Sequence, residues 1–278
     1  MTGTLYVVAT PIGNLGDISS RAVEVLSGVE IIAAEDTRRT RTLLAAIGVA
    51  PPKMLALHDH NEAAVSARVK AALAAGQTVA LVSDAGTPLL SDPGFELVRQ
   101  CFADGLDVRP VPGASALMCA ISVCPLPMAG FRFLGFLPAK ATARRSQLQQ
   151  AAAAGVPAVF FEAPHRMREC LADIAELAGN RRVFIGREMT KRHEAYLCGQ
   201  ARTLHDQLDE NDQWRGEFVC VLEGQVDNHT PADVRHTMSV LCRELSPAQA
   251  ARLGAQLVGG KKNELYQLAL TFKEQTAD

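Results

Sequence analysis

Residues 78–94, TVALVSDAGTPLLSDPG, point to the fold class of this chain. The segment starts with apolar and β-branched residues, as a buried strand does, and continues into a loop of small and polar residues with two prolines. Four further strand patterns occur in the first 111 residues, at 5–9, 29–34, 54–57 and 108–111. Helical patterns at residues 19–26 and 63–75 lie between strands, so we predict crossover connections and a largely parallel sheet, which is an α/β domain.

The same alternation returns in the second half of the chain. Residues 124–135 hold two prolines and two glycines without clear periodicity, which is typical of a connection between domains. Beyond this connection, strand and helix patterns occur at residues 141–154, 158–162, 166–178, 183–186 and 217–222. We therefore predict an N-terminal α/β domain over residues 1–124 and a second α/β domain over residues 125–226.

Residues 227–278 carry three short helical patterns, and the Gly259-Gly260 pair separates the last two. This arrangement resembles a helix-turn-helix, and we predict a small helical appendix. A packing cap or a dimer arm would produce the same pattern, so both alternatives stay open.

Composition excludes several classes of protein. The chain has 278 residues, of which 48% are hydrophobic and 21% charged, so disordered, collagen-like and coiled-coil proteins are ruled out. A formal net charge of -2 argues against a uniformly basic nucleic-acid binder. Residues 132–192 nevertheless hold 11 Lys and Arg against 5 Asp and Glu, so one segment is locally basic.

Cysteine usage and the N-terminal sequence indicate the compartment. Seven dispersed cysteines without a CxxC pair are typical of reduced thiols. The first residues lack the pattern of a secretion signal, and no run reaches about 18 apolar residues. We expect a cytoplasmic protein without a membrane span.

Four loops follow predicted strands, at residues 10–17, 35–41, 83–94 and 112–116. Open α/β sheets bind ligands beyond the carboxyl ends of their strands, so these loops are the candidate site. Taken singly, each could be an ordinary turn. In the second loop, EDTRRTR, Asp36 could simply cap the next helix, with its arginines in solvent. In the third, Ser91 or Asp92 is the expected cap of the helix that follows.

The sequence lacks the motifs of several kinds of catalytic site. The HDHNE stretch at residues 58–62 has no third ligand at suitable spacing, so we predict no metal and a polar loop with Asn61 near a helix start. No GxSxG elbow occurs and no cysteine has an adjacent base, which argues against a covalent nucleophile. GxGxxG is also missing, which makes a dinucleotide oxidoreductase the least favoured enzyme.

Taken together and in order, the motifs resemble those of the tetrapyrrole methylase superfamily and, within it, the ribosomal small-subunit RNA methyltransferase I (RsmI) family. The segments that carry this resemblance are VATPIGNLGDIS, AEDTRRT, HDHNE, VSDAGTPLLSDPG, VPGASA, FLGFLP, FFEAPHR, REMTKRHE and RGEFVCVLEG. They span about residues 4–224, and GGKKNELY extends the likeness into the appendix. The resemblance implies two α/β domains around a cleft for S-adenosylmethionine.

The resemblance also implies an activity and partners. Members of the family methylate the ribose 2′-hydroxyl of a cytidine in the decoding region of 16S rRNA. The implied partner is 16S rRNA within the assembled 30S subunit, and the superfamily implies a homodimer. Two other functions remain open: a methylase of a tetrapyrrole or another small molecule, and an RNA-binding assembly factor without catalysis.

The superfamily's cofactor contacts fall on specific positions of this chain. They are Pro11, Asp84, Ala85, Gly86, Thr87, Leu90, Ser115, Ala116, Glu162 and Met189. Tetrapyrrole members have GGDP where this chain has AGTP, so backbone contacts should persist while side-chain contacts differ.

Catalysis and RNA binding need further groups. Transfer to a ribose hydroxyl is helped by a general base, for which Asp36 is the candidate and Asp84 the reserve. Cationic and polar side chains are candidates for RNA contacts, although a solvated surface is the alternative for each of them. These candidates are Arg38, Arg39, His58, Asn61, Lys140, Arg144, Arg145, Arg166, Arg187, Lys191 and Arg192.

Overall fold

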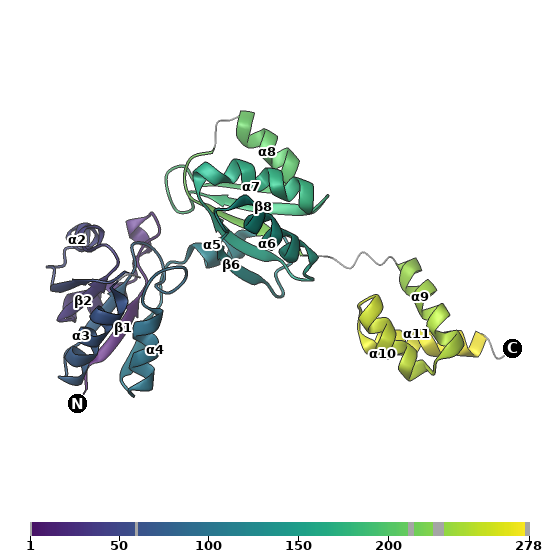
Figure 1. The fold of residues 1–278 in the computed structure, drawn as a ribbon, viewed down its shortest axis with the longest axis horizontal. Coiled ribbons are helices and arrows are strands. Elements are labelled where there is room, and N and C mark those ends of the chain that lie inside the picture. Colours follow the sequence, from purple (N-terminus) through teal and green to yellow (C-terminus); the bar gives the residue numbers. More distant parts are fainter. Residues whose placement is uncertain (1, 59–60, 211–213, 225–230, 276–278) are drawn as a thin grey trace. The chain divides into compact units, whose positions relative to one another are not determined.

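The computed structural model describes residues 2–58, 61–210, 214–224 and 231–275 (Figure 1). The chain forms two compact units, Met1–Gly224 and Gln225–Asp278. Unit 1 contains two five-stranded sheets, and unit 2 is helical.

The first sheet is fully parallel, as predicted, with the strand order β3-β2-β4-β1-β5. Its strands are β1 (Thr4–Val8), β2 (Ile31–Ala34), β3 (Lys53–Ala56), β4 (Val79–Val82) and β5 (Asp107–Val111). All four residues of β2 and of β4 are buried, since helices cover both faces of the sheet. Alternate residues of each strand therefore enter two different hydrophobic cores.

Each of the five strands is followed by one helix, and a short 3₁₀ turn (Leu15–Asp17) lies between β1 and its helix. The helices are α1 (Ser20–Gly28), α2 (Thr37–Ala46), α3 (Glu62–Ala74), α4 (Phe95–Ala103) and α5 (Ala116–Val123). Helices α1 and α2 pack on one face of the sheet, and α3 and α4 pack on the other. Ser19 caps α1 as expected, and Ser115 caps α5.

The start of α4 differs from the prediction. The helix begins at Phe95 after Gly94, so neither Ser91 nor Asp92 is its cap. Gly94 has a φ of +119°, and a Cβ there would lie 2.8 Å from a methyl of Leu81. The cap comes instead from another helix, because Glu62 Oε1 accepts hydrogen bonds from the N–H groups of Glu96 and Leu97 at 2.9 and 3.3 Å.

The second sheet is mixed and has the order β6-β7-β10-β8-β9. Its strands are β6 (Arg132–Phe136), β7 (Ala158–Glu162), β8 (Arg182–Arg187), β9 (Ala195–Gln200) and β10 (Phe218–Leu222). Strand β10 runs antiparallel to both β7 and β8, while β6 is parallel to β7. The edge strands β6 and β9 were not predicted.

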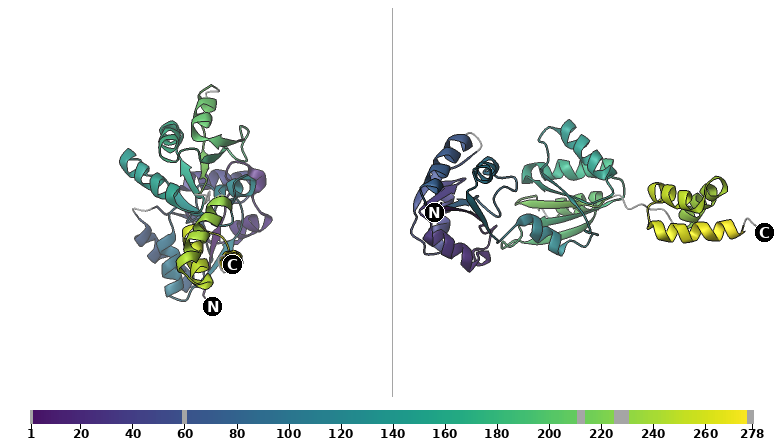
Figure 2. Two further views of the ribbon diagram at one scale, coloured as in Figure 1. Left: turned by 90° about the vertical axis from the view of Figure 1, so that its right-hand side faces the viewer. Right: turned by 90° about the horizontal axis from the view of Figure 1, so that it is seen from below.

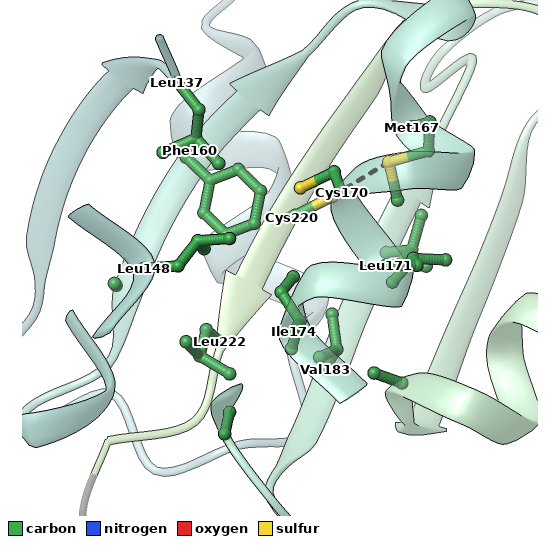
Figure 3. Close-up of a cluster of buried hydrophobic side chains, with 14 of the residues drawn as sticks. Leu137, Leu148, Phe160, Met167, Cys170, Leu171, Ile174, Val183, Cys220 and Leu222 are labelled. Carbon is green, nitrogen blue, oxygen red and sulfur yellow. Dashed lines mark hydrogen bonds between the residues drawn. The ribbon is translucent and has the colours of Figure 1, made fainter. Parts of the chain in front are cut away.

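One face of this sheet is covered by α6 (Ala141–Ala153), α7 (Pro164–Leu177) and α8 (Ala201–Glu210). Figure 3 shows Phe160 and Cys220 of the sheet in one cluster with Met167, Cys170 and Leu171 of α7. The other face packs against α5, whose Leu117 and Ala120 are buried with strand residues of β7, β8 and β10. Helix α5 therefore belongs to the core of the second sheet although it follows the last strand of the first. The division of the two α/β domains between residues 124 and 125 stays a prediction.

Unit 2 consists of α9 (Pro231–Glu244), α10 (Pro247–Leu257) and α11 (Lys262–Gln275), which pack against one another (Figure 2). This matches the predicted helical appendix. Met238, Ala250, Ala251, Leu265 and Ala269 form its core. The turn before α11 contains Gly259 and Gly260 with φ values of +67° and +87°. Across the ranges that the structure describes, no helix is both long and apolar enough to span a bilayer.

Candidate active site

A pocket of about 430 Å³ lies beyond the carboxyl ends of β2 and β4, where the loops after β1, β2, β4 and β5 meet residues of the second sheet. Eight of the ten predicted cofactor contacts line it: Asp84, Ala85, Gly86, Thr87, Leu90, Ser115, Ala116 and Glu162. The other two, Pro11 and Met189, are not among the lining residues. Met189 is instead buried in the core beside α5. The sequence motifs thus converge on one cavity, as expected for parallel strands.

The loop after β4 is tied to its neighbours by backbone hydrogen bonds. The N–H of Thr10 donates to the carbonyl of Gly86 at 2.8 Å, and the N–H of Gly86 donates back to the carbonyl of Thr10 at 3.0 Å. Thr87 Oγ1 donates to the carbonyl of Ala114 at 3.0 Å. Gly86 has a φ of +80°, which favours glycine. The loop is therefore ordered before any ligand arrives, and this lowers the entropic cost of binding.

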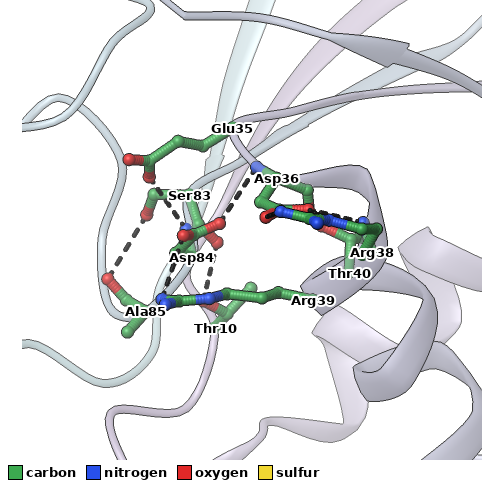
Figure 4. A network of polar contacts seen from close by, with 9 residues as sticks. All are labelled: Thr10, Glu35, Asp36, Arg38, Arg39, Thr40, Ser83, Asp84 and Ala85. Carbon is green, nitrogen blue, oxygen red and sulfur yellow. Dashed lines mark hydrogen bonds and ion pairs between the residues drawn. The ribbon is translucent and has the colours of Figure 1, made fainter.

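Three carboxylates lie in the part of the pocket wall that the loops after β2 and β4 form. Glu35, Asp84 and Asp92 all line it. Figure 4 shows how the first two are held: Glu35 Oε2 accepts from the N–H of Asp84 at 3.1 Å, and Asp84 pairs with Arg39 at 3.1 Å. Burial raises the pKa of Asp92 to about 6, and the charges of Glu35 and Asp84 act in the same direction, against a hydrogen bond from Ser83.

Asp36, the predicted general base, is not among the pocket's lining residues. Its carboxylate caps α2, accepting from the N–H of Arg38 at 2.8 Å and from the guanidinium of Arg38 at 2.7 and 3.2 Å. These hydrogen bonds hold the pKa of Asp36 well below its usual range. A carboxylate so stabilised as an anion is a poor proton acceptor, so the geometry does not support its predicted role.

Glu162 presents a carboxylate on the opposite side of the pocket. Its side chain is fully buried, and Oε1 pairs with Arg166 at 2.6 Å and accepts from the N–H of Ala163 at 2.8 Å. Oε2 has no hydrogen-bond partner among the described residues, and neither has Nε of Arg166. An unpaired buried polar atom costs about 1–3 kcal/mol, which a ligand that donates to it would recover.

Two of the predicted RNA contacts, Arg144 and Asn61, hold other parts of the protein in place. The prediction that Arg144 contacts RNA is wrong, because this residue has a structural role. Its side chain is 3% exposed and joins α6 to α7 through ion pairs with Asp173 at 2.8 Å and Glu169 at 3.3 Å. Asn61 holds its own turn, since its side chain accepts from the N–H of His58 and donates to the carbonyl of Ala56. Residues 59 and 60 of the HDHNE stretch lie outside the described residues.

The other cationic candidates differ in how they are held. Arg145 pairs with Asp173 and Glu176, and Arg187 donates to the carbonyl of Arg215. Lys191 bridges Glu188 and Glu217, each at 3.1 Å, and its stem lies so close to Gly13 that a Cβ there would collide with it. Lys140 and Arg192 are exposed, as are Arg38 and Arg39.

Several lining residues were not predicted as site residues, among them Glu35, Asp92, Phe136 and Glu217. Glu35 and Asp92 lie inside quoted loops, but no local pattern distinguishes them from neighbouring acids. Phe136 belongs to the unpredicted β6, and Glu217 becomes relevant only when β10 is placed next to β7. In the described parts of the chain, no three His, Cys, Asp or Glu side chains form a group that could hold a metal ion.

The chain is similar to known proteins over nearly its whole length. Residues 4–205 match the family Tetrapyrrole (Corrin/Porphyrin) Methylases, and residues 228–273 match the RsmI C-terminal HTH domain. A Ribosomal RNA small subunit methyltransferase I of Xylella fastidiosa is 49% identical, with 95% of this chain and 98% of that protein covered. A protein of the same name from Pseudomonas aeruginosa is 46% identical, with 96% and 97% covered.

The chain belongs to the ribosomal RNA small subunit methyltransferase I family. As a member of this family it is an S-adenosylmethionine-dependent methyltransferase. Its fold is also that of a uroporphyrin-III C-methyltransferase from Thermus thermophilus, solved with S-adenosylhomocysteine (TM-score 0.54, 15% identity, 80% of this chain and 97% of that chain covered). At that identity the likeness concerns the fold alone.

The residues of the pocket fit the cofactor of this family. S-adenosylmethionine carries a positive sulfonium and ammonium, which the carboxylates of Glu35 and Asp84 would complement. Its hydroxyl and amine groups are hydrogen-bond donors, and Oε2 of Glu162 is an unused acceptor.

Proposed function

We propose that this methyltransferase acts on the small-subunit ribosomal RNA, at the ribose 2′-hydroxyl of a cytidine in the decoding region. The observation that carries the proposal is the near full-length similarity to proteins named Ribosomal RNA small subunit methyltransferase I, which includes the C-terminal helical unit. The choice of cytidine and of the 2′-oxygen rests on the motif resemblance described above.

When bound, S-adenosylmethionine supplies a methyl group activated by the sulfonium. The chain's part is to hold the donor and the acceptor hydroxyl in line at about 3 Å, which can lower the barrier by about 7–11 kcal/mol. The ordered segments 85–87 and 115–116 are suited to hold the cofactor through their backbone groups, with Glu162 contacting it from the second sheet. Pro11 and Met189 would support these segments from outside the pocket.

Cations of unit 1, of which Arg39 lines the pocket, are suited to position the RNA backbone. Arg38, Arg39, Lys140, Arg187 and Lys191 are our proposed phosphate contacts, together with Arg166 beside Glu162 and the ring of His58. Each phosphate neutralised adds about 0.7 to 0.9 to the slope of log affinity against log salt. The substrate is proposed to be the assembled or partly assembled 30S subunit, and the enzyme a cytoplasmic homodimer.

The test is transfer of a labelled methyl group to 30S subunits from a strain that lacks the family's enzyme. We expect label on one nucleotide of 16S rRNA whose 3′ phosphodiester resists alkali, because a 2′-O-methyl group blocks that cleavage. Labelling of a tetrapyrrole precursor instead would favour the small-molecule methylase. Cofactor binding without transfer to either substrate would favour the non-catalytic assembly factor.

A further inference from the structure

Asp92 lies in the most constrained part of the loop that follows β4. Leu89 and Ser91 have φ values of +75° and +73°, a conformation that non-glycine residues seldom adopt. Such backbone outliers cost about 1–3 kcal/mol each and cluster at functional sites. Gly94 closes the segment against Leu81 and Leu89. The loop therefore holds Asp92 in the wall of the pocket at an energetic cost.

Five carboxylates line the pocket, and four of them are engaged by cations or backbone N–H groups. Glu35 accepts from the N–H of Asp84, and Asp84 accepts from the N–H of Asp36 and pairs with Arg39. From the second sheet, Glu162 pairs with Arg166 and Glu217 with Lys191. Each of these four carboxylates thus has a cation or a backbone N–H group as a direct partner.

Asp92 has a different environment. Burial is the main cause that raises its pKa, the charges of Glu35 and Asp84 act in the same direction, and the neutral hydroxyl of Ser83 acts against them. The cations that line or border the pocket, Arg39, Arg166 and Lys191, form ion pairs with other carboxylates. Asp92 is thus a pocket carboxylate whose burial and acidic neighbours favour uptake of a proton.

We propose that Asp92 is the general base that removes the proton from the acceptor hydroxyl during methyl transfer. The inference rests on the proposed function, because a ribose hydroxyl must lose its proton. The hydroxyl oxygen bonds to the methyl carbon with cleavage of the donor's carbon–sulfur bond, whose electron pair stays on sulfur. The hydroxyl proton moves to a carboxylate oxygen of Asp92, which then returns it to water. Charge balances, since the sulfonium and the carboxylate are both neutralised.

The electrostatics suit this task at neutral pH. With a pKa of about 6, Asp92 is mostly ionised at pH 7 and yet more basic than an ordinary aspartate. A base is most effective when its pKa lies near the working pH. Because only the ionised form accepts a proton, the rate should fall as the pH drops through about 6.

The experiment measures single-turnover methylation of 30S subunits between pH 5 and 9, with the cofactor bound beforehand. We expect Asp92→Asn to lower the rate by about 100- to 10,000-fold and to remove its decline toward acid pH. Calorimetry should find cofactor affinity almost unchanged. In the wild-type protein without substrate, carbon NMR of labelled aspartate should show a carboxyl with a midpoint near pH 6 that is absent from Asp92→Asn.

Two further variants sharpen the test. Glu35→Gln removes a neighbouring charge, so the acid decline of the rate should move to lower pH. Asp104→Asn changes an exposed acid that pairs with Lys70 away from the pocket and should leave the profile as it is. A folded Asp92→Asn protein with the wild-type rate and profile would overturn the proposal, and so would loss of cofactor binding. If the wild-type protein methylates no rRNA, the proposed function itself fails.

Discussion

Asp36 shows how hydrogen bonds from a side chain and from the backbone determine what a carboxylate can do. Its side chain accepts from the N–H of Arg38 in the first turn of α2, which is the work of a helix cap. Asparagine caps helices about as well as aspartate, so Asp36→Asn should lower turnover far less than the 100- to 10,000-fold expected for a lost general base. The comparison is turnover of both proteins on 30S subunits at saturating cofactor. A large loss in a protein of normal stability would restore Asp36 as the base.

Gly86 tests the backbone geometry of the loop after β4, which we propose to hold the cofactor. At its φ of +80° a side chain is strained, and a Cβ would lie 3.2 Å from a methyl of Ile12 in the neighbouring loop. Gly86→Ala should cost about 1–2 kcal/mol of stability and also weaken cofactor binding. Gly48 is a matched control, because it has a φ of +73° and open space where a Cβ would stand. Urea unfolding and calorimetry of both variants should show similar losses of stability, with weaker binding only for Gly86→Ala.

At the scale of elements, strands β2 and β4 of the first sheet were predictable because burial on both faces leaves continuous apolar runs. β9 escaped prediction because it is an edge strand whose residues alternate between partly buried and exposed positions. β6 escaped because Gly135, with a φ of +64°, interrupts it and shifts its register against β7. The site residues likewise divide into those that the sequence predicts and those that it does not. Loops after parallel strands could be assembled from the sequence, and the helix cap at Asp36 is local enough to be among the alternatives there. The environment of Asp92 instead depends on burial and on the charge of Glu35 from another loop.

The basic character of residues 132–192 is likewise an element-scale property, since helix packing decides which cations remain available. Arg144→Ala would leave Asp173 buried with Arg145 as its remaining cation. We expect a loss of about 2–3 kcal/mol, below the usual 3–5 kcal/mol because one partner is kept. The salt dependence of RNA binding should not change.

Lys140→Ala should have the opposite effects. Stability should be preserved, and the slope of log affinity against log salt should fall by about 0.7.

Denaturation and filter binding at several salt concentrations measure the two effects. The assignment of Arg144 to structure would be wrong if its alanine variant kept full stability and lost salt dependence. A Lys140→Ala protein with an unchanged slope would remove Lys140 from the proposed phosphate contacts.

At the scale of the whole molecule, the pocket is lined entirely by residues between Ile12 and Val219, all within unit 1. Unit 2 has its own core around Met238 and Leu265. Binding of the cofactor and binding of the ribosomal substrate should therefore be separable. A chain ending at Gly224 should bind S-adenosylmethionine with the affinity of the full protein.

The same truncation should lower kcat/KM for 30S subunits by at least about tenfold, equivalent to about 1.4 kcal/mol of lost contact with the substrate. Leu265→Asp in the full chain is the companion variant, because it places a charge in the core of unit 2 without shortening the protein. Both variants should raise KM more than they lower kcat, since the chemistry lies in unit 1. Equal losses in cofactor affinity and turnover would instead mean that the helical unit acts by stabilising the pocket, as a packing cap would.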